Sequence, residues 1–254
     1  MKQIDESFGD TCQELVWTPQ MIARFWNFES RRPQNFFTYQ VGAALIHYFR
    51  RYLNSASRIV DYGAGPGFLV EDLIASGHQC AAIEFAPDAV RLLSTKLAGK
   101  PNFLGAYHID EISAMNGRFD LAFVIEVVEH LYEKDLDTCL DAVRGLLARG
   151  GLLIVTTPND EDRSQSFIMS PETGKVFHRW QHVRSWSAAT LQHEICRRGF
   201  ERVEIGETDL GASIKAVRRS FPWPVRLARA SLKRLYRLLR PETAPHLYIV
   251  ARKI

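Results

Sequence analysis

The chain has 254 residues, 46% hydrophobic and 24% charged, with a formal net charge of +3, values that are ordinary for a soluble globular protein able to bury a core. Its four cysteines are far apart with no Cys-x-x-Cys pair, which argues against a disulfide framework or a zinc knuckle. The acidic, polar N-terminus and the lack of any run of roughly 18 apolar residues argue against a secretory signal and a membrane-spanning helix, so we expect a cytoplasmic protein.

Residues 1–54 are predicted to form an N-terminal helical cap. Apolar residues recur there every three or four positions, with an interruption at Pro33. The aromatic side chains of this region are expected either to pack as plain core or to form a lid over a ligand. They include Trp17, Trp26, Phe36, Phe37 and Tyr39.

From residue 55 onward, short apolar runs alternate with helical patterns. The runs 58–62, 79–85, 102–107, 118–127, 151–159 and 200–207 are predicted strands, and 69–77, 86–99, 133–150 and 187–199 are predicted helices. This alternation indicates parallel βαβ units in an α/β, doubly wound, Rossmann-like sheet. The last strand-like run, 246–254, lacks a crossover helix unless the segment before it serves as one.

A glycine-rich turn, "DYGAGPG", follows the first predicted strand. Gly63, Gly65 and Gly67 allow a sharp turn and a close approach of the backbone to a ligand, and the next helix offers free N–H groups. The spacing G-x-G-x-G differs from the G-x-G-x-x-G of dinucleotide sites. Asp61 would repel a pyrophosphate but can accept hydrogen bonds from water or a cationic ligand. A tight turn without a ligand is the structural alternative.

Glu84 ends the second predicted strand, 17 residues after Gly67. A carboxylate at this position can accept hydrogen bonds from both hydroxyls of a ribose. Viewed alone, Glu84 is equally explained as a surface charge at a strand end. Together with the glycine turn, it predicts a nucleoside cofactor.

Over nearly its whole length the sequence resembles the class I S-adenosylmethionine-dependent methyltransferases. The stretches that carry the resemblance are "VDYGAGPG", "IEF", "GRFDLAFVIEVVEHL", "GGLLIVTTPN" and "HLYIVARK". The resemblance implies a seven-stranded sheet over residues 55–254, whose last strand is antiparallel and inserts beside strand five. It implies S-adenosylmethionine as cofactor, and a polar residue beside the adenine. The residues that it implies for cofactor binding are Asp61, Gly63, Gly65, Gly67, Glu84, His108, Asp110 and Glu126.

Glu126, Glu129 and His130 follow the fourth predicted strand, at the sheet edge where open α/β sheets bind ligands. If the chain turns helical at once, the three side chains share one helical face. Two carboxylates and an imidazole can bind a divalent cation or accept a proton. Alternatively, Glu129 and His130 cap the helix and hydrogen-bond neighbouring loops.

This part of the sequence resembles two groups within the family. The ubiquinone-pathway O-methyltransferases share the pattern Glu-x-x-Glu-His and a later His before an aromatic residue and a helix. The small-RNA 3′-terminal 2′-O-methyltransferases use a similar pattern to hold a divalent metal. The resemblance implies Glu126, Glu129, His130 and His182 as catalytic residues and as ligands of a cation such as Mg²⁺. His182 matches this pattern better than His178, because its spacing along the sequence to Trp186 and the helix that follows is the one that the pattern has.

A hydroxyl acceptor must lose its proton or have its pKa lowered, whereas methyl transfer itself mainly needs alignment. The cluster therefore favours O-methylation of a small-molecule, lipid-linked or glycan hydroxyl. A metal-dependent RNA 2′-O-methyltransferase is the first alternative. An NAD-dependent oxidoreductase and a non-catalytic cofactor-binding scaffold are alternatives of other classes. No nucleic-acid partner is expected, because no RNA-binding motif occurs elsewhere in the chain.

Residues 213–241 are predicted to form a basic helical insertion before the last strand. Nine of the 32 Lys and Arg residues lie between Ser213 and Arg240, where there is no Asp or Glu. Within 225–240, basic residues occupy one helical face and apolar residues the other. The alternatives are an ordinary surface helix, a peripheral contact with an anionic membrane or a phosphorylated acceptor, and RNA binding through phosphates.

Overall fold

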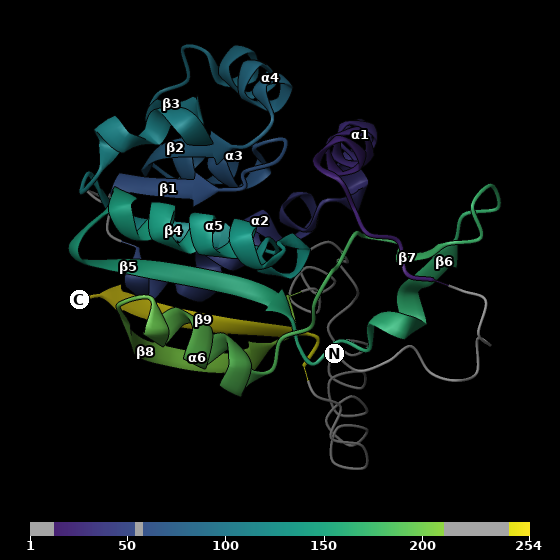
Figure 1. The fold of residues 1–254 in the computed structure, drawn as a ribbon. Helices are drawn as coiled ribbons and strands as arrows, with labels where there is room; N and C mark the ends of the chain where they lie inside the picture. Colours follow the sequence, from purple (N-terminus) through teal and green to yellow (C-terminus); the bar gives the residue numbers. More distant parts are fainter. Residues whose placement is uncertain (1–12, 54–57, 211–243) are drawn as a thin grey trace, which may run out of the picture.

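The computed structural model describes residues 13–53, 58–210 and 244–254, and a seven-stranded sheet forms its centre (Figure 1). The strand order is β3-β2-β1-β4-β5-β9-β8. The strands are β1 (Arg58–Tyr62), β2 (Gln79–Glu84), β3 (Phe103–His108), β4 (Phe119–Ile125), β5 (Leu147–Pro158), β8 (Phe200–Thr208) and β9 (His246–Lys253).

Helices cover both faces of this sheet. They are α2 (Phe37–Phe49), α3 (Phe68–Ala75), α4 (Pro87–Leu97), α5 (Glu133–Leu146) and α6 (Ala188–Arg197). Helix α1 (Pro19–Glu29) lies away from the sheet faces, and Glu29 is its only buried residue. Val60 of β1 faces the core under α5 and α6, whereas Ile59 faces the core under α2, α3 and α4. This alternation follows from the two-residue period of a strand, and it explains why buried parallel strands are apolar on both faces.

The antiparallel last strand lies inside the sheet, as the resemblance implied. β9 pairs antiparallel with β5, where Val250 is opposite Ile154, and with β8, where Ile249 is opposite Ile205. The pairs β1–β2, β2–β3, β1–β4 and β4–β5 are parallel. The predicted doubly wound sheet with an antiparallel last strand and N-terminal helices is therefore confirmed.

The N-terminal helix α2 shares the core of the sheet. Val41, Leu45 and Phe49 of α2 are buried in the same core as Ile59 and Leu121. The expected interruption is a 3-10 turn at Pro33–Asn35. The predicted boundary at 54/55 falls among residues 54–57, outside the described residues.

A two-stranded hairpin of β6 (Phe167–Met169) and β7 (Val176–His178) was not predicted from the sequence. Its strands have three residues each, too short for alternation to reveal them. The whole basic insertion 213–241, including its predicted helix 225–240, lies outside the described residues. None of the helices within 13–53, 58–210 and 244–254 is long and apolar enough to cross a bilayer.

Candidate active site

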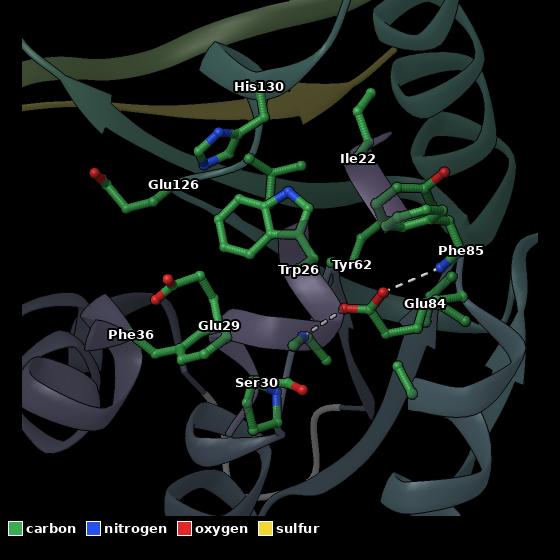
Figure 2. A pocket seen from close by; sticks show the side chains of 18 of the residues that line it. Ile22, Trp26, Glu29, Ser30, Phe36, Tyr62, Glu84, Phe85, Glu126 and His130 are labelled. Carbon is green, nitrogen blue, oxygen red and sulfur yellow. Dashed lines mark hydrogen bonds between the residues drawn. The ribbon is translucent and has the colours of Figure 1, made fainter. Parts of the chain in front are cut away.

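A cavity of about 900 Å³ opens where β1, β2 and β4 end (Figure 2). Its walls come from α1, the glycine turn, the ends of β2 and β4, and the segment before α6. The carboxyl ends of parallel strands meet at one edge of a doubly wound sheet, where the loops that follow them form a crevice. Most of the predicted site residues are on these loops.

The three glycines of the turn adopt left-handed backbone angles, with φ of 79° at Gly63, 54° at Gly65 and 79° at Gly67. A Cβ on Gly63 would lie 2.7 Å from a methyl carbon of Val127, and one on Gly67 would lie 2.5 Å from Leu93. Gly63 and Gly65 line the cavity. Gly67 instead precedes α3 as its N-cap residue. Glycine is required here for both conformation and space.

Glu84 lines the cavity, and its carboxylate is fixed by two backbone groups (Figure 2). The N–H of Gly65 donates to one oxygen at 2.5 Å, and the N–H of Phe85 donates to the other at 3.1 Å. Burial raises the pKa of Glu84, while these two hydrogen bonds lower it. Each carboxylate oxygen retains a further lone pair, so Glu84 can accept hydrogen bonds from two hydroxyls.

Asp61 lies behind the glycine turn and outside the cavity lining. Its side chain is buried, and one of its oxygens has no hydrogen-bond partner among the described residues. Burial, and then the charge of Glu84, raise the pKa of Asp61 to about 8. An orphaned buried oxygen next to a cavity fits a site that a ligand or water completes.

Of the two polar residues predicted beside the adenine, His108 lines the cavity and Asp110 does not. The Nε2 atom of His108 lies 2.6 Å from the carbonyl oxygen of Phe85, and its Nδ1 accepts from the backbone N–H of Asp110. The side chain of Asp110 is 86% exposed.

Glu126 lines the cavity but is not part of the group that Glu129 forms with His130 and His182, and its Oε2 instead lies 3.6 Å from Nδ1 of His246. The continuous helix that would place Glu126, Glu129 and His130 on one face is not formed. Glu126 has a φ of 52°, Val128–His130 form a 3-10 turn, and α5 begins only at Glu133. The hydroxyl of Thr156 donates to the Glu126 carboxylate at 2.9 Å, so this carboxylate is held against the end of β5.

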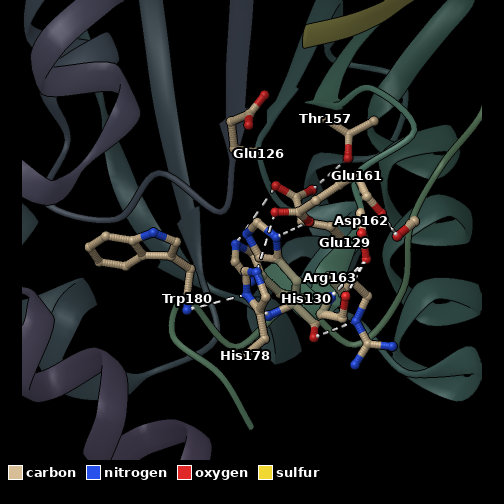
Figure 3. A network of polar contacts seen from close by, with 12 residues as sticks. Glu126, Glu129, His130, Thr157, Glu161, Asp162, Arg163, His178 and Trp180 are labelled. Carbon is tan, nitrogen blue, oxygen red and sulfur yellow. Dashed lines mark hydrogen bonds and ion pairs between the residues drawn. The ribbon is translucent and has the colours of Figure 1, made fainter. Parts of the chain in front are cut away.

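Glu129, His130 and His182 come together at the cavity (Figure 3). One ligand atom from each lies within 4.8 Å of the others. The hydroxyl of Thr157 donates to Oε2 of Glu129 at 3.1 Å, whereas Oε1 has no hydrogen-bond partner in the described part of the chain. This free oxygen is 3.8 Å from Nε2 of His130.

Burial controls the protonation of this group. Burial, and then the charge of Glu126, raise the pKa of Glu129 well above its usual value. Burial, and then His182, lower the pKa of His130 to about 3. Glu129 therefore favours its protonated form and His130 is neutral near pH 7, so neither side chain carries a charge in the ligand-free cavity.

Sequence reasoning missed Glu161 and set aside His178. Glu161 follows β5, and its Oε2 lies 2.5 Å from Nδ1 of His182, while its Oε1 lies 3.3 Å from Nε2 of His178. The two imidazole rings are stacked, with centroids 4.2 Å apart. Burial raises the pKa of Glu161, but the two histidine side chains beside it outweigh that effect and lower the pKa to about 2.

Gln181 connects the N-terminal helix to this group. The indole N–H of Trp26 donates to Oε1 of Gln181 at 3.0 Å, and Nε2 of Gln181 donates to the carbonyl oxygen of His130 at 3.1 Å. The Trp26 ring also contacts the His130 ring edge-on, with centroids 4.9 Å apart. Helix α1 thereby forms a wall of the cavity next to the histidines.

Comparisons with known proteins agree with the topology. Residues 31–205 match a family described as a methyltransferase domain. A ubiquinone biosynthesis O-methyltransferase from Nitrobacter winogradskyi is 29% identical over 157 residues, which are 60% of this chain and 58% of that protein. A protein with the same description from Rhodopseudomonas palustris is 30% identical over 148 residues, 56% of each chain. The chain thus spans less than two thirds of the length of these curated relatives.

Solved methyltransferase structures share the fold. A 1,6-didemethyltoxoflavin-N1-methyltransferase from Burkholderia thailandensis, solved with S-adenosylhomocysteine, superimposes with a TM-score of 0.59 at 14% identity, covering 96% of this chain and 93% of that one. This family and fold are not those of the NAD-dependent oxidoreductases considered as an alternative. The chain belongs to the class I S-adenosylmethionine-dependent methyltransferases.

Proposed function

We propose that this protein transfers a methyl group from S-adenosylmethionine to a hydroxyl group of a small-molecule, lipid-linked or glycan acceptor. One observation carries the proposal: Glu84 and the glycine turn line the same cavity as Glu129, His130 and His182. The predicted nucleoside site and a group of ionisable side chains therefore share one cavity. The O-methyltransferases named above, which match just over half of this chain, agree with a hydroxyl acceptor.

The residues of the cofactor end fit S-adenosylmethionine, which when bound supplies an electrophilic methyl group on a sulfonium. Glu84 would accept hydrogen bonds from both ribose hydroxyls, because its oxygens are already oriented by Gly65 and Phe85. Gly63 and Gly65 let the backbone approach the ligand closely. His108 lines the same end of the cavity and would face the adenine.

At the acceptor end, His182 would remove the proton of the acceptor hydroxyl. A neutral imidazole within hydrogen-bond reach of a hydroxyl can act as a general base. The adjoining wall is apolar and includes Pro19, Ile22 and Trp26 from α1. Such a wall favours an acceptor with an apolar body that carries the reactive hydroxyl.

The same side chains would fit a divalent cation. The donor set is one carboxylate and two imidazoles, and the free Oε1 of Glu129 offers the oxygen. Imidazole-rich sets favour Zn²⁺ or Fe²⁺ over Mg²⁺, which prefers oxygen ligands and retains water. A cation there would act as a Lewis acid that lowers the pKa of the acceptor hydroxyl.

The proposal is tested in two steps. Calorimetry should detect binding of S-adenosylhomocysteine, and a screen of hydroxylated acceptors with an apolar body should then detect turnover. His182→Ala and Glu129→Gln should abolish most turnover while retaining cofactor binding. His193→Ala, at an exposed position on α6, is the matched control and should keep full activity.

Three outcomes would contradict this function. Cofactor binding without turnover on any acceptor would favour the non-catalytic scaffold. Binding of single-stranded RNA that weakens steeply with salt would favour the RNA 2′-O-methyltransferase. Full turnover by both variants would show that the cluster is structural.

A further inference from the structure

The two stacked histidines have different hydrogen-bonding surroundings. Nδ1 of His178 accepts from the backbone N–H of Trp180 at 3.3 Å and from that of His182 at 3.2 Å. A backbone N–H cannot accept a hydrogen bond, so Nδ1 of His178 must be unprotonated. In a neutral ring the proton is then on Nε2, which lies 3.3 Å from Glu161.

Glu161 imposes the opposite tautomer on His182. An ionised carboxylate only accepts hydrogen bonds, and its Oε2 lies 2.5 Å from Nδ1 of His182. Nδ1 must therefore carry the proton, which leaves the lone pair on Nε2. The neighbours of His182 on the cavity side are the His130 ring, 4.9 Å away between centroids, and the carboxyl of Glu129.

The surrounding segments hold Glu161 and His182 in place. The hydroxyl of Ser185 donates to the carbonyl oxygen of Glu161 at 2.5 Å, and Nε of Arg163 donates to the carbonyl oxygen of His182 at 3.1 Å. Side chains that orient a functional imidazole through its other ring nitrogen are a general feature of catalytic and metal-binding histidines.

We infer that Glu161 is the positioning residue of His182: while Nε2 of His178 faces its other oxygen at 3.3 Å, Glu161 holds His182 in the Nδ1–H tautomer and directs the Nε2 lone pair to the acceptor site. This inference rests on the proposed function for the role of His182. The tautomer itself does not depend on turnover and can be observed in the protein without ligands.

Glu161→Gln gives a specific expectation. The carboxamide of glutamine has an oxygen that accepts hydrogen bonds and an NH2 group that only donates them. His178 remains an Nε2–H donor, because its backbone partners are unchanged, so the amide oxygen turns to His178. The amide NH2 group then faces Nδ1 of His182. Nδ1 must accept a hydrogen bond from it, so the proton of the ring moves to Nε2. The substitution should therefore reverse the tautomer of His182 while leaving that of His178 unchanged.

The experiment is long-range ¹⁵N–¹H correlation spectroscopy of metal-free protein labelled with ¹⁵N-histidine, with resonances assigned from single-site variants. In the native protein we expect Nε2–H for His178 and Nδ1–H for His182. Glu161→Asp, which keeps both accepting oxygens, should preserve Nδ1–H. Glu172→Gln, at an exposed glutamate of the same segment, is the matched control and should change neither ring.

A double variant tests the reasoning directly. In His178→Phe with Glu161→Gln, the amide oxygen is free to face His182, so the Nδ1–H tautomer should return. In the activity assay, Glu161→Gln should lower kcat about 10- to 100-fold, the range typical of residues that orient a functional histidine. The affinity for S-adenosylhomocysteine should stay within twofold of the native value.

The inference is overturned if His182 has the Nε2–H tautomer in the native protein. This measurement does not depend on whether any variant folds. It is equally overturned if folded Glu161→Gln keeps Nδ1–H on His182. A reversed tautomer in Glu161→Gln with an unchanged kcat would support the positioning of His182 by Glu161 but contradict the proposed role of His182 in turnover. Failure of the inference and failure of the proposed function are therefore distinguishable.

Discussion

Replacing Glu84 by Gln tests the cofactor end of the cavity. Both carboxylate oxygens accept a backbone N–H, from Gly65 at 2.5 Å and from Phe85 at 3.1 Å. In Glu84→Gln an amide NH2 group replaces one carboxylate oxygen. This group can only donate, so it would face a backbone N–H that also donates, and it cannot accept a hydrogen bond from a ribose hydroxyl. The variant therefore loses an accepting position toward the ligand and disturbs the orientation of the remaining oxygen.

The magnitude follows from the value of a hydrogen bond to a charged group, about 1.5–3 kcal/mol. The bond to one ribose hydroxyl is lost, and part of the second is lost through misorientation. We expect a loss of about 2–3 kcal/mol, which corresponds to a roughly 30- to 150-fold increase in the dissociation constant of S-adenosylhomocysteine.

Isothermal titration calorimetry with S-adenosylhomocysteine measures this change. Asp88→Asn, on α4, is the matched control, because Asp88 is exposed and its partner Arg91 is also exposed. Its dissociation constant should equal the native one. A dissociation constant for folded Glu84→Gln within threefold of the native value would refute the assignment of Glu84 to the ribose.

Three further predictions concern stability. Gly63→Ala should lower the free energy of unfolding, measured by urea denaturation, by about 1–3 kcal/mol more than Gly77→Ala. Both glycines have a positive φ, but only at position 63 would the added Cβ lie 2.7 Å from a methyl carbon. Since the pKa of Asp61 is about 8 in the folded state and lower when unfolded, the folded state binds the proton more tightly. The ligand-free protein should therefore lose stability as pH rises from about 4 to about 8, by at most about 1.4 kcal/mol per pH unit, and Asp61→Asn should flatten this dependence. Trp26→Phe should cost about 1–3 kcal/mol, because it leaves the buried amide oxygen of Gln181 without its donor, and an unchanged urea midpoint would contradict that contact.

The fold was predictable because its signals are local. Buried parallel strands such as 79–85 and 118–127 differ clearly in pattern from the helices between them, and the observed β2 and β4 lie within these ranges. The antiparallel direction of β9 was predicted from the family resemblance, because the periodicity of a single segment does not determine the direction of a strand in the sheet.

The arrangement of the site was less predictable because it depends on contacts between distant segments. The pairing of Glu161 with His178 and His182 brings together the end of β5 and the segment before α6. The acidic sequence "NDED" after strand five and the two nearby histidines were the signals that could have suggested it. The left-handed conformation of Glu126, which separates it from His130, has no sequence signal because glutamate rarely adopts it.

The link through Gln181 has a consequence for how a substrate enters. Any movement of α1 that separates Trp26 from Gln181 opens a wall of the cavity and, in the same event, removes the ring that contacts His130. The His130 ring then lacks this neighbour while molecules exchange with solvent, and it regains the contact when the wall closes. Entry of a substrate and full packing of this ring therefore exclude one another in time.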